Sequence, residues 1–177
     1  YSGYEPVITL AKAELIQMDT SQTDFVLTPD LLEATLEEHG DQVKAVILNY
    51  PSNPIGVTYT REEVKSLADV LKKYPVFVMC DEIYSELVYD ETHTSIAEFI
   101  PNQTILINGL SKSHAMTGWR IGFLFGPKEL IKEIVKVHQY LVTAASTISQ
   151  KAAYAALTTS MNAGEEMKKE YQVRRDF

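Results

Sequence analysis

Residues 104–122 read TILINGLSKSHAMTGWRIG, and this stretch decides the fold. Its first four residues form a short apolar run that is typical of a buried strand. Lys112 then lies in the loop that leaves the carboxyl end of this strand, and Arg120 follows before the next apolar run. A lysine amine can form an imine there, and an arginine beside it can hold a phosphate. Most lysines are simply solvated, so the meaning of Lys112 depends on the rest of the chain.

Two further polar motifs follow apolar runs. The sequence NYPSNPIG at residues 49–56 ends the run 43–48, and Asp81-Glu-Ile-Tyr84 follows the run 76–80. Either motif alone is ordinary, because Asn-Pro pairs commonly start turns and acidic residues commonly end strands. All three motifs nevertheless fall at carboxyl ends of expected strands, and open α/β sheets bind ligands at that edge. The sequence therefore predicts a ligand site built from three loops.

The ordered set of N-P-x-G, D-x-x-Y, S-K and G-W-R-x-G resembles the class I and II, fold-type-I aminotransferases that depend on pyridoxal 5′-phosphate (PLP). The resemblance spans nearly the whole chain. It implies an incomplete three-layer α/β large domain, with a mostly parallel sheet covered by helices on both faces. Residues 1–164 would be part of this cofactor domain, and residues 165–177 would begin a connector helix toward a small domain. Because complete members of the family are much longer, the resemblance also implies a fragment without the N-terminal phosphate loop and the small domain.

The resemblance assigns the catalytic and cofactor-binding residues. Lys112 would form the Schiff base with PLP and then move the substrate's Cα proton. Asp81 would keep the pyridine nitrogen protonated, which makes the ring a better electron sink. Asn53 and Tyr84 would donate hydrogen bonds to the ring 3-oxygen, and Arg120 would clamp the phosphate.

Two further residues complete the expected cofactor site. Tyr1, in the opening motif YSGY, would stack on the pyridine ring, and Ser111 would donate a hydrogen bond to the phosphate or to a neighbouring group. Some relatives carry a phosphate-binding serine at the position that Gly109 holds here.

The implied function is ping-pong transamination between an amino acid and a 2-oxo acid, in a full-length protein that forms a homodimer. Three alternatives remain open: a PLP-dependent carbon–sulfur β-lyase, an aminotransferase-like sensor domain of a transcription regulator, and a piece that is inactive alone. The motif AMTGWRIG favours aminotransferases over the lyases. Aromatic, aspartate, alanine and N-acetyl-diaminopimelate donors remain possible substrates.

Composition limits the partners. The 177 residues suffice for one core, and 24 acidic against 16 basic residues give a net charge of −8, which does not favour nucleic acid or anionic lipid. No apolar run suggests a membrane span and no signal segment opens the chain, so a cytoplasmic protein is expected. The single cysteine, Cys80, excludes an internal disulfide and is expected to be a buried structural thiol. The four histidines show no metal-ligand spacing, and the segment from Asp90 to His93 is expected to be a solvated loop.

Periodicity and capping signals predict alternating elements. Thr28 and Thr60 are the expected N-caps of two helices, the second with Glu63 as a capping box. The expected helices are 6–12, 29–38, 61–73, 127–142, 147–158 and 165–175, the expected strands are 43–49, 76–80, 104–107 and 120–125, and residues 14–18 are expected to be extended.

Overall fold

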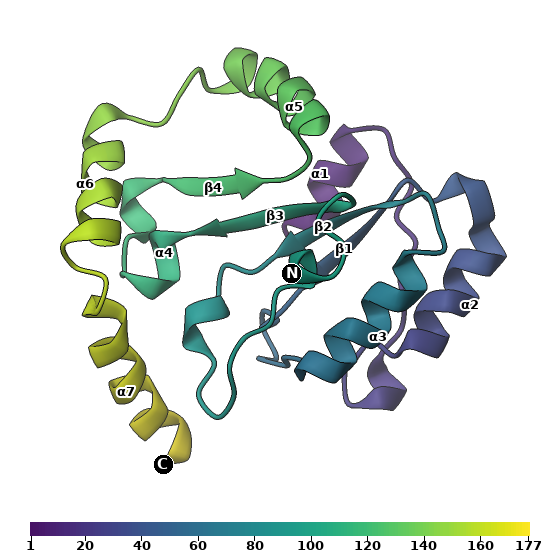
Figure 1. The fold of residues 1–177 in the computed structure, drawn as a ribbon, viewed down its shortest axis with the longest axis horizontal. Helices are drawn as coiled ribbons and strands as arrows, with labels where there is room; N and C mark the ends of the chain where they lie inside the picture. The colour runs from purple at the N-terminus through teal and green to yellow at the C-terminus, as the bar shows by residue number, and fades with distance from the viewer.

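A computed structural model describes all residues, 1–177, and is built around a four-stranded sheet (Figure 1). The strands are β1 (Ala45–Asn49), β2 (Phe77–Asp81), β3 (Thr104–Gly109) and β4 (Gly122–Phe125), in the order β1-β2-β3-β4. The first three are parallel, whereas β4 runs antiparallel to β3. The predicted α/β class with a mostly parallel sheet is therefore confirmed, with one antiparallel strand at an edge.

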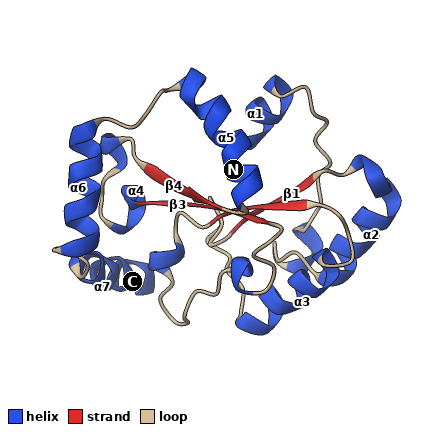
Figure 2. Cartoon of the chain, turned by 45° about the horizontal axis from the view of Figure 1, so that its top comes forward, coloured by secondary structure: helices blue, strands red, loops and turns tan.

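One face of the sheet is covered by α2 (Pro29–His39) and α3 (Arg61–Leu71), as Figure 2 shows. Both predicted N-caps are present: Thr28 Oγ1 accepts a hydrogen bond from the backbone of its helix, and Thr60 forms a full capping box with Glu63. The apolar stripe of α3 is buried against β1 and β2. This face holds the main hydrophobic core, whose members all lie within residues 27–100.

The opposite face carries α1 (Tyr4–Leu10) and α5 (Lys128–Leu141) (Figure 2). Helices on both faces were expected, and they are found. The packing on this face is thin, because neither helix has a buried residue. Helix α5 is amphipathic as predicted, but Val137 is 60% exposed and Leu141 76% exposed.

A second, smaller hydrophobic cluster lies beside β4. It joins α4 (Leu110–Ser113) to α6 (Thr147–Thr158) through Leu110, Met116, Ala153 and Ala156. Ser149 of α6 also donates a hydrogen bond to the carbonyl of Trp119 at 2.6 Å. This cluster therefore fixes the segment that contains Lys112.

The last helix, α7 (Ala163–Asp176), is attached mainly through its far end. Arg175 pairs with both carboxylate oxygens of Asp90, the shorter distance being 2.6 Å, and its guanidinium lies 4.9 Å from the ring centroid of Tyr89. The helix predicted for 165–175 is thus present and contacts the loop that follows β2.

Several boundaries differ from expectation. The strand predicted from Arg120 begins only at Gly122, because Arg120 has a left-handed backbone (φ 51°) after a short 3₁₀ turn. Residues 14–18 join no sheet. The 3₁₀ turns, which were not predicted, are η1 (Ser21–Thr23), η2 (Gly40–Gln42), η3 (Ser85–Leu87), η4 (Ile96–Glu98) and η5 (Thr117–Trp119). None of the helices combines the length and apolar character that a bilayer crossing requires.

Candidate active site

The expected site loops all leave the same edge of the sheet. The parallel strands end at Asn49, Asp81 and Gly109; Asn49 pairs with Asp81 in the sheet register, and β3 continues two residues beyond Ile107, the partner of Asp81. Because β4 is antiparallel and Gly122 pairs with Gly109, the segment before β4 reaches this edge too. The edge predicted from sequence is therefore where the structure brings the candidate residues together.

Gly109 allows these segments to approach closely. A side-chain carbon at Gly109 would lie 3.2 Å from Cα of Gly122, 3.2 Å from the carbonyl oxygen of Ile121 and 3.3 Å from the side chain of Ile83. Such contacts are tighter than ordinary packing permits. Glycine therefore fits where some relatives carry serine.

Asp81 is held by two hydrogen bonds to its carboxylate. The N–H of Ile83 donates to Oδ1 at 3.2 Å, and the hydroxyl of Tyr4 donates to Oδ2 at 2.8 Å. Burial, followed by the contact with Asp81, raises the pKa of Tyr4 above its usual value, so the hydroxyl remains a neutral donor. These two donors fix the orientation of the carboxylate.

Tyr4 was not among the predicted site residues. The sequence offers only one hint of its role, its place in the motif YSGY, in which Tyr1 is the predicted site residue. Tyr1 is 64% exposed, and its ring packs edge-on against Tyr4 at a centroid distance of 5.4 Å. Tyr1 thus contacts Tyr4, which in turn is hydrogen-bonded to Asp81.

Asn53 and Tyr84 meet as predicted. The side-chain amide of Asn53 donates to the hydroxyl of Tyr84 at 3.4 Å. Asn49 orients both loops, since its side chain accepts from the N–H of Asn53 at 3.0 Å and donates to the carbonyl of Asp81 at 3.1 Å. The amide of Asn53 and the hydroxyl of Tyr84 are thereby gathered next to Asp81.

Lys112 belongs to α4, and its amine faces Tyr84. Nζ lies 5.4 Å from the centroid of the Tyr84 ring. Lys112 takes part in none of the ion pairs of the chain. The half-buried amine is therefore free to react with a ligand.

Arg120 and Ser111 are linked through Thr117. Arg120 donates to the carbonyl of Thr117 at 3.0 Å, and the Thr117 hydroxyl donates to the carbonyl of Ser111 at 2.9 Å. The exposed guanidinium of Arg120 pairs with no carboxylate, which leaves it free for an anion. Ser111 contributes its backbone to this arrangement.

The fold and this edge define an α/β protein whose ligand site combines an unpaired lysine, an oriented carboxylate, two hydrogen-bond donors and an unpaired arginine. The family described as "Aminotransferase class I and II" matches residues 1–177. The chain therefore belongs to the class I and II aminotransferases, which are enzymes of the transferase class.

Individual relatives agree with this assignment. The chain is 54% identical over its whole length to the "Probable N-acetyl-LL-diaminopimelate aminotransferase" of Bacillus subtilis (strain 168), and covers 44% of that protein. It is 41% identical to the aspartate aminotransferase of Geobacillus stearothermophilus, over 86% of this chain and 39% of that protein. The chain thus spans less than half the length of these curated relatives.

Solved structures agree as well. A double mutant of Thermus thermophilus aspartate aminotransferase superposes with a TM-score of 0.93 at 34% identity, over 99% of this chain and 46% of that chain. The aromatic aminotransferase of Pyrococcus horikoshii OT3 superposes with a TM-score of 0.92 at 36% identity, over 99% of this chain and 48% of that chain. The resemblance found in the motifs is confirmed at the level of the fold.

Proposed function

We propose that this chain is the cofactor-binding part of an amino acid:2-oxo acid aminotransferase that binds PLP through Lys112. The observation that carries the proposal is the free amine of Lys112 facing Tyr84, at the sheet edge where Asp81 also lies. Because the chain covers less than half of its relatives, the activity is proposed for the full-length protein. Residues 165–177, within α7, would lead into its remaining domain.

The groups present fit PLP in their chemistry. The cofactor carries an aldehyde, a ring nitrogen, a phenolic oxygen and a phosphate. An amine, a carboxylate, a pair of neutral donors and a guanidinium suit these four groups respectively. The matching residues are Lys112, Asp81, Asn53 with Tyr84, and Arg120 with support from Ser111.

Each residue then has a definable task. PLP, when bound, supplies an electron sink for the bond that breaks at the substrate Cα. Nζ of Lys112 is the attachment point and afterwards the base that takes the Cα proton. Asp81 would keep a proton on the ring nitrogen, and Arg120 would offer the phosphate a planar, bidentate contact. Tyr1, next to Tyr4, would cover one face of the ring.

Transamination is preferred over the two alternatives that keep the cofactor. A carbon–sulfur β-lyase or a PLP-sensing regulator could share the same fold, because fold alone does not determine reaction. The relatives reported above are named aminotransferases. Among possible donors, an N-acetylated diaminopimelate comes first in a substrate panel because the relative with 54% identity carries that name. Aspartate and aromatic amino acids come next.

The test is to locate the attachment point in the full-length protein. Borohydride reduction of the cofactor-loaded protein, followed by peptide mapping, should place the label on Lys112. Lys128 and Lys151 serve as internal controls, since both side chains are exposed, on α5 and α6 respectively. A label on either of them, or no label anywhere, would contradict the proposal.

A further inference from the structure

A buried carboxylate lies directly behind the site and has no part in the proposed chemistry. Glu82 is 2% exposed. Its Oε1 accepts hydrogen bonds from the hydroxyl of Ser95 at 2.7 Å and from the thiol of Cys80 at 3.2 Å. Its Oε2 lies 2.8 Å from Nε2 of His93. We call these four residues the Glu82 cluster.

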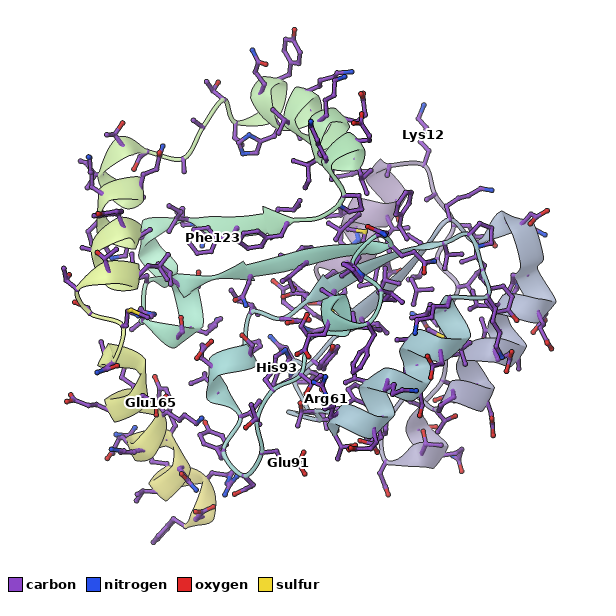
Figure 3. The ribbon with its side chains drawn as sticks, in the orientation of Figure 1. Lys12, Arg61, Glu91, His93, Phe123 and Glu165 are labelled. Carbon is purple, nitrogen blue, oxygen red and sulfur yellow. The ribbon has the colours of Figure 1, made fainter.

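His93 is the only basic side chain in contact with Glu82. Its own side chain is 12% exposed, and it belongs to the segment that was expected to be solvated, so that expectation was wrong for His93. In Figure 3, His93 lies on the inner side of the loop and Glu91 at its outer turn. Nδ1 of His93 is buried without a partner, so the tautomer that carries its proton on Nε2 suits the contact.

The other groups around the carboxylate are neutral. Burial, followed by the charge of Glu82, raises the pKa of the Cys80 thiol, which therefore stays a protonated donor. The Tyr50 ring stacks on His93 at a centroid distance of 5.2 Å, and burial raises the pKa of Tyr50 as well. A buried carboxylate without such partners would be costly, so the donors of the cluster and Glu82 hold one another in place.

The cluster joins the loops that carry the site. Glu82 is the residue after Asp81, and its N–H donates to the carbonyl of Ile107 at 2.9 Å, beside β3. His93 and Ser95 lie on the returning part of the loop that begins at Tyr84. The Glu82 carboxylate thus ties the start of this loop, next to Asp81 and Tyr84, to its returning part.

Tyr50 extends the cluster to the loop of Asn53. Its hydroxyl accepts from the N–H of Ile96 at 2.8 Å and donates to the carbonyl of Thr94 at 3.1 Å. Its backbone N–H donates to the carbonyl of Asp81 at 3.3 Å. Tyr50, which precedes the turn that carries Asn53, is therefore hydrogen-bonded both to Asp81 and to the segment next to His93 and Ser95.

We propose that Glu82, through His93 and Ser95, is a positioning residue that sets the separation between the carboxylate of Asp81 and the hydroxyl of Tyr84. The inference rests on the proposed function, in which Asp81 would contact the ring nitrogen and Tyr84 the 3-oxygen of one rigid ring. Groups that share a rigid ligand must be held to within a fraction of an ångström, and buried partners behind them supply that restraint.

The test compares variants of the full-length protein loaded with PLP. Glu82→Gln keeps the shape but replaces one acceptor oxygen by an amide, and Glu82→Ala removes both oxygens. Glu91→Gln is the matched control, because it changes an exposed acidic residue of the same loop. We expect Glu82→Ala to weaken PLP binding and slow the first half-reaction by about tenfold or more. Glu82→Gln should show a smaller loss and Glu91→Gln none.

A second readout separates positioning from general stabilisation. The pH at which the visible absorbance of bound PLP changes depends on the groups around the ring and should shift in Glu82→Gln but not in Glu91→Gln. Unchanged absorbance and affinity in a folded Glu82 variant would overturn the inference, even if its melting temperature fell. Should both Glu82 variants fail to fold, Ser95→Ala decides: it removes one donor to Glu82 and should shift the pH midpoint relative to the unmodified protein and to Glu91→Gln, and an unshifted midpoint would overturn the inference. An unlabelled Lys112 in the unmodified protein would instead refute the proposed function itself.

Discussion

At the scale of single residues, two neighbouring acidic side chains, Asp81 and Glu82, have different partners. Asp81 receives Tyr4 on the ligand side, while Glu82 next to it faces the buried cluster. The alternation follows from the strand, since successive side chains point to opposite faces. One strand end thus carries two neighbouring carboxylates, Asp81 toward Tyr4 and Glu82 toward the buried cluster.

Tyr4→Phe tests the ligand side of this arrangement. The change removes the donor to Asp81 but keeps the ring against Tyr1. Because a hydrogen bond to a charged group contributes about 1.5–3 kcal/mol, the half-reaction rate of the full-length protein should fall by roughly tenfold or more. The raised pKa of Tyr4 keeps the donor protonated, so this loss should be the same at every pH below the usual range of tyrosine titration.

Stopped-flow absorbance of the PLP-loaded protein measures this effect. Tyr140→Phe is the control, because Tyr140 is 89% exposed on α5 and loses only a solvated hydroxyl. Equal rates for the two variants would show that the bond between Tyr4 and Asp81 has no catalytic importance.

At the scale of elements, α3 and α5 have similar amphipathic sequences and different surroundings. Leu67 of α3 is 1% exposed within the main core, whereas Leu141 of α5 is 76% exposed. Periodicity predicted both helices but not this difference, because a stripe shows which face can be buried and not what covers it.

Leu67→Ala and Leu141→Ala therefore form a matched pair. In the 177-residue chain, the first should lower the free energy of unfolding by about 2–5 kcal/mol, since it leaves a cavity in a packed core. At a protein concentration low enough to keep the chain monomeric, the second should change it by less than about 0.5 kcal/mol. Urea unfolding followed by circular dichroism measures both. A large loss for Leu141→Ala would mean that α5 packs against something in solution.

The elements also show what sequence can and cannot predict. Apolar runs located all four strands, and Thr60 with Glu63 located the start of α3, because these signals are local. The direction of β4 and the left-handed backbone at Arg120 were missed, since both depend on how the lysine loop packs. The contacts of Tyr4 and His93 were missed for a related reason, as each joins residues distant in the sequence. Motif residues were predictable; the residues that support them were not.

At the scale of the whole molecule, the candidate site lies between two hydrophobic clusters. Asn53, Asp81 and Tyr84 belong to loops of the main core, whereas Lys112 lies in the segment fixed by the smaller cluster. A ligand that contacts both sets would tie the clusters together. Several apolar side chains of α5 are exposed, and the outer edges of β1 and β4 pair with no other strand of this chain.

We predict that the 177-residue chain alone binds PLP weakly, shows no measurable transaminase activity and associates with itself. Arg120 is the only predicted phosphate-clamping cation, and the exposed apolar face of α5 favours self-association. Titration with PLP, an assay with an amino acid and a 2-oxo acid, and size-exclusion chromatography at several concentrations test the three parts. Tight binding with turnover equal to the full-length protein would show that residues 1–177 already build the whole site.

The division into two clusters also follows the order of synthesis. Members of the main core end at residue 100, and those of the smaller cluster begin at Leu110. As a chain leaves the ribosome from its N-terminus, the main core can assemble while Lys112 is still being made or is inside the exit tunnel. The nascent protein can therefore hold Asn53, Asp81 and Tyr84 in place before Lys112 has emerged.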